Sequence, residues 1–165
     1  MSTGLVVWLT GLPSSGKSTL ARAAAQQLRA SGVSVAVLDG DEVRAALRPT
    51  PGYDDEARAA FYATLGGMAA LLARQGLVVL VPATANRASF RAEARSLAPR
   101  FLEVFVDTPL ETCVARDAKG LYAAATHGAT HTMPGRGAVY EPPISPDLIV
   151  HGDPTDVTRL VQACR

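Results

Sequence analysis

The sequence has few cysteines, few aromatic residues and no long apolar or charged run. Two of its 165 residues are cysteine, and neither shows metal-ligand spacing. No apolar stretch approaches the roughly 20 residues of a membrane-spanning helix. The formal net charge is +1 without a basic cluster, which argues against a nucleic-acid polymer or a membrane as partner. We therefore expect a globular, reduced, cytoplasmic protein.

Lysine is also scarce. Of the 16 basic residues other than histidine, all are arginine except Lys17 and Lys119. In such a background, a lysine indicates a place that needs a compact ammonium group rather than a guanidinium fork. The motif around Lys17 supports this interpretation, whereas chance explains Lys119 equally well.

The composition is typical of a globular protein, with 48% hydrophobic and 19% charged residues. The length fits one domain, residues 1–165. Short apolar runs alternate with helical stretches, which is typical of an α/β fold with a parallel sheet. The runs are nearly continuous, as in strands that are covered on both faces. The expected strands are Leu5–Leu9, Val33–Leu38, Leu77–Val81, Phe101–Val106 and Asp147–Val150.

Helices are expected in the gaps between these strands. Their ranges are Lys17–Ala30, Asp54–Gln75, Ser89–Leu97, Pro109–Arg116 and Pro154–Ala163. Asp153 is the expected N-cap of the last helix, with Pro154 at its first position. Residues 119–146 are rich in Gly, Thr, His and Pro without periodicity, and we expect them to form a lid loop lacking regular structure.

The strongest motif is Gly11-Leu12-Pro13-Ser14-Ser15-Gly16-Lys17-Ser18, a full match to G-x-x-x-x-G-K-[ST] between an apolar strand and an Ala-rich helix. In such a P-loop, backbone N–H groups and the helix N-terminus surround the phosphates of a nucleotide. Lys17 is expected to reach the β- and γ-phosphates, and Ser18 to ligate Mg²⁺. The residues expected to bind ATP here are Gly11, Ser14, Ser15, Gly16, Lys17, Ser18 and Thr19.

A carboxylate must complete this site, because no acidic residue ends the strand Leu77–Val81. Asp39 and Asp41 directly follow the second expected strand, at the sheet edge where ligands gather. One could serve the metal and the other could take the proton of an attacking hydroxyl. We assign Ser18 and Asp39 to the metal, and the identity of the base stays open. The alternative is an acidic turn in which Asp41 caps the next helix.

With these residues in view, the chain resembles the adenylylsulfate kinases. Phe101–Glu111 and Ala115–Tyr122 follow that family's pattern nearly residue for residue, and Trp8–Leu12, Leu38–Arg44 and Tyr140–Pro143 match as well. The resemblance implies a three-layer P-loop kinase fold with a five-stranded parallel sheet and a C-terminal lid, commonly in homodimers. It also implies transfer of the γ-phosphoryl group of ATP, with Mg²⁺, to the 3′-hydroxyl of adenylylsulfate in sulfate assimilation.

The resemblance also assigns roles to individual residues. Arg116 and Asp117 would lie near the ATP base, and Lys119 would begin the lid. Arg44 and Arg58 would bind the anionic part of the acceptor, since buried anions favour guanidinium groups. Solvated helix surface is the alternative for these two arginines.

The departures from the family gather at the acceptor. Phe61 replaces an asparagine, and it also fits the apolar stripe of its helix. The family's Phe-Ile-Ser-Pro-x-Arg reads Pro82–Arg87, so that only Arg87 and the hydroxyl of Thr84 remain. In the family's Lys-Asn-Phe-Thr-Gly, the lysine is replaced by His131 and the phenylalanine by Met133.

By family analogy, the two lost aromatic rings stack on the acceptor base, and losing each removes about 1–3 kcal/mol of binding. The residues expected at the acceptor are Asp41, Arg44, Arg58, Phe61, Arg87, His131 and Met133. Two hypotheses therefore stand side by side: a divergent adenylylsulfate kinase, and a kinase of another nucleoside- or sugar-like alcohol. A nucleotide sensor without turnover is less favoured, because it needs no acceptor base.

Overall fold

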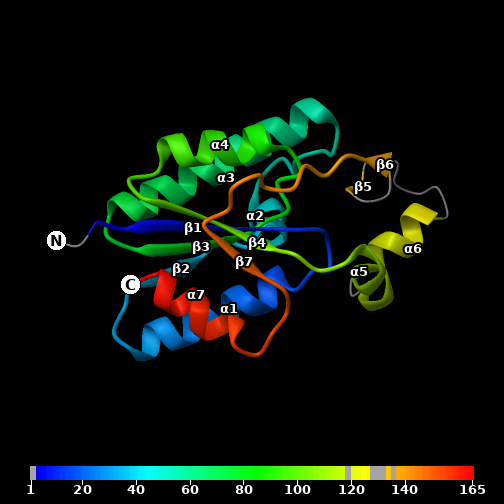
Figure 1. Ribbon diagram of the computed structural model, residues 1–165. Helices are drawn as coiled ribbons and strands as arrows, with labels where there is room; N and C mark the ends of the chain where they lie inside the picture. The colour runs from blue at the N-terminus through cyan, green and yellow to red at the C-terminus, as the bar shows by residue number, and fades with distance from the viewer. Residues whose placement is uncertain (1–2, 118–119, 127–132, 135–136) are drawn as a thin grey trace.

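A five-stranded, wholly parallel sheet forms the centre of the computed structural model, which describes residues 3–117, 120–126, 133–134 and 137–165 (Figure 1). The strands are β1 Leu5–Thr10, β2 Val35–Val37, β3 Val78–Pro82, β4 Phe101–Val106 and β7 Leu148–Val150, in the order β2-β3-β1-β4-β7. All five strands expected from the sequence are confirmed. The edge strand β2 is shorter than expected, because it pairs with a neighbour on one side only.

Helices cover both faces of the sheet and give the three layers of a P-loop kinase fold (Figure 1). Helices α1 Lys17–Ala30 and α7 Asp156–Ala163 lie on one face, and α3 Asp55–Arg74 and α4 Ala88–Leu97 on the other. The remaining elements are α2 Gly40–Ala46, α5 Leu110–Arg116, α6 Leu121–Thr126, β5 Met133–Pro134 and β6 Gly137–Ala138. The chain termini lie at one end of the sheet, and α5, α6 and the β5–β6 pair lie at the opposite end.

The central strand β1 supplies both halves of the core. Leu5, Val7 and Leu9 pack towards α1 and α7, whereas Val6 and Trp8 pack towards α3 and α4. All five are at most 2% exposed. This alternation explains why the strand reads as an unbroken apolar run, since both of its faces are removed from water.

The start of the last helix differs from the expectation. The helix α7 begins at Asp156 with Thr155 as its N-cap, so the expectation for Asp153 and Pro154 is wrong. Asp153 instead accepts hydrogen bonds from the backbone N–H and hydroxyl of Thr155. The buried carboxylate of Asp156 accepts two more, from the N–H groups of Gly152 and Asp153. These hydrogen bonds hold residues 152–155 in a turn, so the helix begins only after it.

The lid region, residues 119–146, also differs from the expectation, because it contains a helix and two short strands. The carboxylate of Asp117 accepts hydrogen bonds from the N–H groups of Tyr122 and Ala123, at 2.9 and 3.0 Å, and so begins α6. A helix of six residues is too short to show periodicity. Its start therefore depends on this cap more than on a pattern of apolar residues.

Both cysteines are free and buried. Burial raises the pKa of the Cys164 thiol to about 11 and also raises that of Cys113. Thiols with raised pKa values are poor nucleophiles at neutral pH. None of the helices in the described ranges is long and apolar enough to cross a membrane.

Two adjacent glycines in α3 give a test of how this helix is held against α4. A Cβ added at Gly66 would lie 3.1 Å from the Cβ of Ala94, whereas one added at Gly67 meets nothing within 4 Å. We expect Gly66→Ala to lower the free energy of unfolding by about 1–3 kcal/mol through overpacking. Gly67→Ala should raise it by about 0.5–1 kcal/mol through helix propensity. Denaturant unfolding of both variants measures the contrast, and equal effects would contradict this packing.

Candidate active site

The phosphate-binding motif forms a tight loop between β1 and α1. Gly11 has no room for a side chain, since an added Cβ would lie 2.6 Å from the carbonyl oxygen of Val106. Ser14 and Gly16 have φ angles of +61° and +100°, in the left-handed region. Such a backbone turns successive N–H groups towards one concave side, which is how a protein surrounds an anion without using side chains.

The ammonium group of Lys17 is held across this loop. Its Nζ donates to the carbonyl oxygens of Gly11 and Leu12, at 2.9 and 2.7 Å. The Tyr122 hydroxyl donates to the carbonyl oxygen of Pro13 at 2.8 Å, so that the start of α6 also supports the P-loop. The lysine is 8% exposed and lines the cleft, where it can meet a phosphate.

The two carboxylates after β2 have different surroundings. Asp39 is buried, and its Oδ2 accepts the hydroxyl of Ser18 at 2.5 Å while its Oδ1 accepts the N–H of Asp41 at 3.0 Å. Asp39 is therefore the N-cap of α2, and the alternative in which Asp41 caps this helix is wrong. Asp41 is exposed and lines the cleft. Gly40 allows the turn to approach Ala83, whose Cβ would lie 3.1 Å from an added Cβ.

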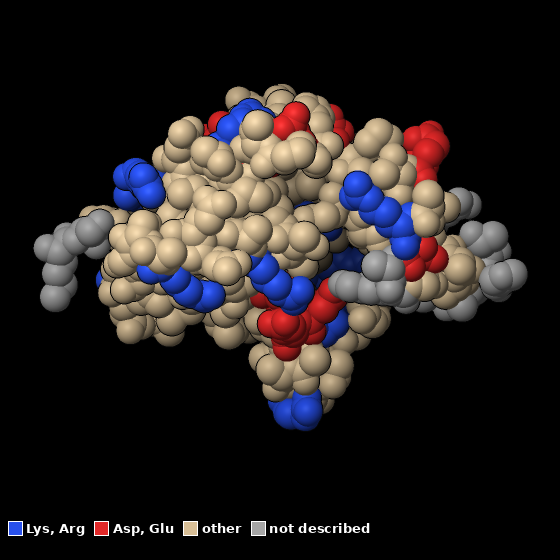
Figure 2. Space-filling view, turned by 90° about the horizontal axis from the view of Figure 1, so that it is seen from below, with Lys and Arg blue, Asp and Glu red and all other residues tan. Residues whose placement is uncertain are grey.

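A cleft of about 670 Å³ opens at the carboxyl ends of the strands, within the size range of small-molecule sites. Figure 2 shows the molecule from the side of α1 and α7, with a hollow that has basic atoms in its depth and acidic atoms beside it. Its walls include the P-loop, the first residues of α2, part of α3 and the loop after β3. Lys17, Ser18, Asp41, Phe61 and Thr84 are among the residues that line it.

One end of the cleft extends towards the turn before α7. Arg116, Val150, Gly152, Asp153 and Val157 line this end. Of these five residues, the sequence analysis placed only Arg116 near the nucleotide base; Asp117, expected there as well, accepts hydrogen bonds from the start of α6. The other four lie at the end of the parallel strand β7 or in the segment that follows it, and that position is the signal that could have found them. Gly152 makes the turn with a φ angle of +87°.

Arg44 lies inside a stack of two aromatic rings. Its guanidinium carbon is 4.3 Å from the ring centroid of Tyr53 and 4.2 Å from that of Phe61. Its Nη1 donates to the carbonyl oxygens of Pro51 and Gly52, at 3.1 and 2.9 Å. Arg44 is 8% exposed, so the alternative of a solvated surface arginine is wrong. The stack had no signal in the sequence, because its members come from α2, α3 and the loop between them.

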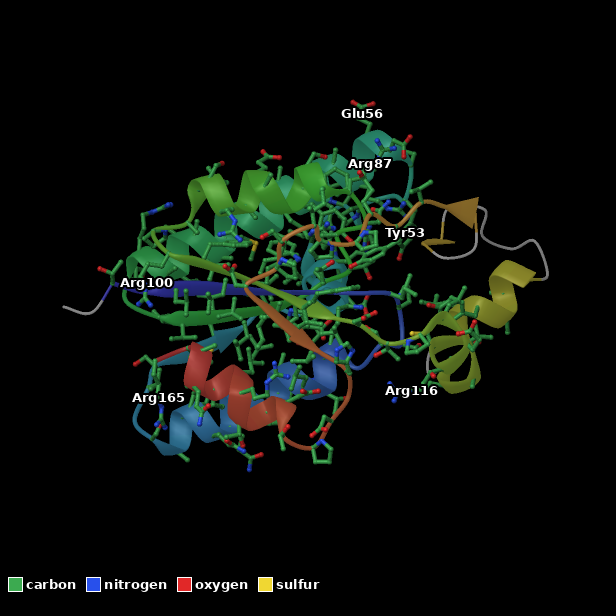
Figure 3. All side chains as sticks on the ribbon, in the orientation of Figure 1. Tyr53, Glu56, Arg87, Arg100, Arg116 and Arg165 are labelled. Atoms are coloured by element: carbon green, nitrogen blue, oxygen red, sulfur yellow. The ribbon has the colours of Figure 1, made fainter. Side chains whose placement is uncertain are left out.

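Arg58 and Arg87, which were also expected at the acceptor, lie in different surroundings. Arg58 is buried in the first turns of α3, one turn before Phe61. Arg87 does not line the cleft; it is half-exposed and pairs with Asp55 at 3.5 Å. Figure 3 shows Arg87 at the start of α3, whereas Arg116 lies on the other side of the sheet. Arg87 follows the cleft-lining residue Thr84 by three positions, and this closeness in sequence is not enough to bring its side chain into the cleft.

Three further residues of the expected site lie in the lid region. Lys119 and His131 fall outside the described residues. Met133 is the first residue of β5, and the structure describes it by its backbone alone. Their expected roles stay predictions.

The oxygen atoms near the P-loop suit Mg²⁺. Among the described residues, no group of three or more His, Cys, Asp or Glu side chains forms a metal cage. Mg²⁺ in kinases typically uses one or two protein oxygens and completes its shell with phosphates and water. The contact between the Ser18 hydroxyl and the Asp39 carboxylate fits that requirement.

The fold and the cleft together define a P-loop phosphotransferase. The adenylylsulphate kinase family matches residues 3–151. The adenylyl-sulfate kinase of Chloroflexus aurantiacus is 46% identical over 151 residues, which are 92% of this chain and 81% of that protein. That of Yersinia pestis is 45% identical over 164 residues, or 96% and 75% of the two chains.

A solved structure agrees with these relatives. The APS kinase CysC of Mycobacterium tuberculosis, in complex with AMPPNP and APS, is 39% identical and superposes with a TM-score of 0.92 over 99% of this chain and 96% of that one. The chain belongs to the adenylylsulfate kinase family. It is an ATP-dependent kinase whose acceptor is a hydroxyl group of a small molecule.

Proposed function

We propose that this kinase transfers the γ-phosphoryl group of ATP to the 3′-hydroxyl of adenylylsulfate and releases 3′-phosphoadenylylsulfate. The observation that carries the proposal is the meeting of Lys17, Ser18 and Asp41 in one cleft, with Asp39 held behind them. The relative of 39% identity, solved with AMPPNP and APS, supports this pairing of substrates.

The nucleotide half of the reaction uses the P-loop. Its N–H groups and the N-terminus of α1 bind the β- and γ-phosphates, and the Lys17 ammonium balances the charge that moves between them. Ser18 and Asp39 would hold Mg²⁺, which would further neutralise the charge of the phosphate oxygens. Arg116 and the turn around Gly152 contact the base end of ATP.

In the acceptor half of the reaction, we assign the role of proton acceptor to Asp41. Asp39 is buried and bonded to the hydroxyl of Ser18, a residue of the proposed metal site, whereas Asp41 is exposed and lines the cleft. Asp41 therefore accepts the proton of the attacking hydroxyl. The buried guanidinium groups of Arg44 and Arg58 attract the anionic part of the acceptor, at a depth where water screens little of their charge.

A second candidate is a kinase of another nucleoside- or sugar-like alcohol. Its support is the replacement of the family's asparagine by Phe61, whose ring packs on Arg44. Pro82, where the family has an aromatic ring, lines the cleft. A site built this way offers less stacking surface to an adenine and more apolar surface beside the guanidinium group.

A comparison of acceptors separates the two candidates. Purified protein is given ATP, Mg²⁺ and either adenylylsulfate or one of a panel of nucleoside- and sugar-like alcohols, and products are detected by the mass of an added phosphate. We expect 3′-phosphoadenylylsulfate at the highest kcat/KM. A product from another alcohol, with none from adenylylsulfate, would replace the first candidate by the second.

The stack on Arg44 gives a mutational test of the acceptor site. We expect Phe61→Leu to raise KM for the acceptor by about 2- to 30-fold, since cation–π contacts contribute about 0.5–2 kcal/mol. KM for ATP should stay unchanged. The matched control is Phe90→Leu, because Phe90 belongs to the same apolar cluster and stacks on Tyr62, whereas the guanidinium group of Arg44 lies over Tyr53 and Phe61. Equal changes of KM in both variants would contradict a role for the stack in acceptor binding.

A further inference from the structure

Arg91 is a buried arginine to which the sequence analysis gave no role. It lies on α4, is 1% exposed, and uses its guanidinium group to join three separate segments. Nη1 donates to the carbonyl oxygen of Ala85 at 2.5 Å, Nη2 to that of Glu141 at 2.6 Å, and Nε to the carboxylate of Glu103 at 3.1 Å. A buried guanidinium is costly unless its donors are matched, so this arrangement is a specific one.

Two of the joined segments also bind each other directly. The N–H of Glu141 donates to the carbonyl oxygen of Asn86 at 2.8 Å, and the side chain of Asn86 donates to the carbonyl oxygen of Val139 at 3.0 Å. Residues 83–86, after β3, and residues 139–141, near the end of the lid region, therefore form one hydrogen-bonded unit, with Arg91 bound to both. We call this unit the loop–lid junction.

The loop–lid junction extends to the strand that precedes the P-loop. The hydroxyl of Thr10, the last residue of β1, donates to the carbonyl oxygen of Thr84 at 2.5 Å and lies 2.9 Å from the hydroxyl of Tyr140. The Tyr140 ring lies 5.9 Å from the guanidinium carbon of Arg91. Burial raises the pKa of Tyr140 to about 12, so its hydroxyl keeps its proton at neutral pH.

The backbone of the loop after β3 needs such support. Ala85 has a φ angle of +43°, in the left-handed region that residues with a Cβ avoid. Its N–H donates to the Tyr62 hydroxyl at 3.0 Å, and its carbonyl oxygen accepts from Arg91. Ala83 and Thr84, just before it, line the cleft. Whatever holds Ala85 therefore sets the position of the wall that faces the acceptor.

We propose that Arg91 is a positioning residue for the acceptor: it holds residues 83–86 against residues 139–141, so that the acceptor wall of the cleft and the end of the lid region act as one rigid unit. The proposal rests on the proposed function for the presence of an acceptor in this cleft. It does not depend on which alcohol that acceptor is. Its consequence is kinetic, because small displacements of a positioning wall strongly affect a reaction that depends on alignment.

The first test is steady-state kinetics of Arg91→Met, which keeps the length of the side chain and removes its donors. With the acceptor that the wild type uses, we expect kcat/KM for the acceptor to fall about 10- to 100-fold. KM for ATP should be unchanged, and ATP hydrolysis without acceptor should rise as water enters the loosened site. Arg91→Lys should be intermediate. The control is Arg95→Met, on the same helix, which loses an exposed ion pair to Asp147 and should behave as wild type.

The second test is hydrogen exchange of the amides, which needs no acceptor. Arg91→Met should speed exchange in both residues 83–86 and residues 139–141, while Arg95→Met should change neither. Faster exchange in only one segment, or a loss of kcat/KM for the acceptor no larger than that of Arg95→Met, would overturn the proposal. If Arg91→Met does not fold, Tyr140→Phe takes its place. This variant removes the hydroxyl partner of Thr10 and should give the same pattern with smaller changes; a wild-type pattern would overturn the proposal.

If the wild type phosphorylates no acceptor, the proposed function fails, whereas the exchange experiment still decides whether Arg91 holds the loop–lid junction together.

Discussion

Lys17→Met is expected to lower kcat by about 10²- to 10³-fold, the loss typical of removing one preorganised charge from a transition state. The methionine keeps the packing of the buried stem, so the fold should survive. The lysine ammonium is fixed across the P-loop by the carbonyl oxygens of Gly11 and Leu12, where it can follow charge as it develops on the transferring phosphoryl group. Release of ADP at saturating ATP and acceptor measures the effect.

A matched control for this variant lies on the same helix. Arg29 is in the last turn of α1, is exposed, and donates to the carbonyl oxygen of Val35, far from the cleft. Arg29→Met should leave kcat unchanged. If Lys17→Met retained wild-type turnover and ATP affinity, the cleft would not be the site of phosphoryl transfer.

Asp41→Asn is expected to lower kcat by about 10²- to 10⁴-fold without changing the Mg²⁺ concentration that the enzyme needs. Asp39→Asn should instead raise that concentration, because Asp39 shares Ser18 with the proposed metal site. Asparagine caps helices as well as aspartate does, so α2 should keep its cap in this variant. Initial rates at a series of Mg²⁺ concentrations distinguish the two variants.

The contrast between these carboxylates is a direct test of their assignment. The same shift of Mg²⁺ requirement in both variants would mean that Asp41 also serves the metal, and that another group takes the proton. A large loss of kcat in Asp39→Asn that saturating Mg²⁺ restores would agree with the assignment made here.

Much of the fold could be predicted because it depends on local patterns. Strands buried on both faces read as continuous apolar runs, and α1 was predicted at its observed limits, Lys17–Ala30, because a P-loop determines where its helix begins. The predictions failed where a few hydrogen bonds decide the backbone. The six-residue helix α6 begins on the Asp117 carboxylate, and the turn before α7 is organised by Asp156. Neither has a periodic signal in the sequence.

The candidate site, like the fold, has a part that could be predicted from the sequence and a part that could not. The phosphate-binding residues are consecutive, and Asp39 and Asp41 directly follow a strand, so sequence spacing was enough to propose them. The acceptor side was not predictable in this detail. Arg87 was expected in the cleft but pairs with Asp55, and the stack around Arg44 depends on how α2 and α3 meet.

By itself, the sequence determined the nucleotide half of this protein: a parallel sheet, a P-loop at the end of its first strand, and carboxylates after the second. These features need only neighbouring residues and the direction of a strand, which are local properties of the chain. Only the tertiary structure decided which residues form the proposed acceptor wall of the cleft and how they are held. Thr10, Thr84, Arg91 and Tyr140 are far apart in sequence, and their hydrogen bonds and ring contact form only when β1, β3, α4 and the lid region pack together.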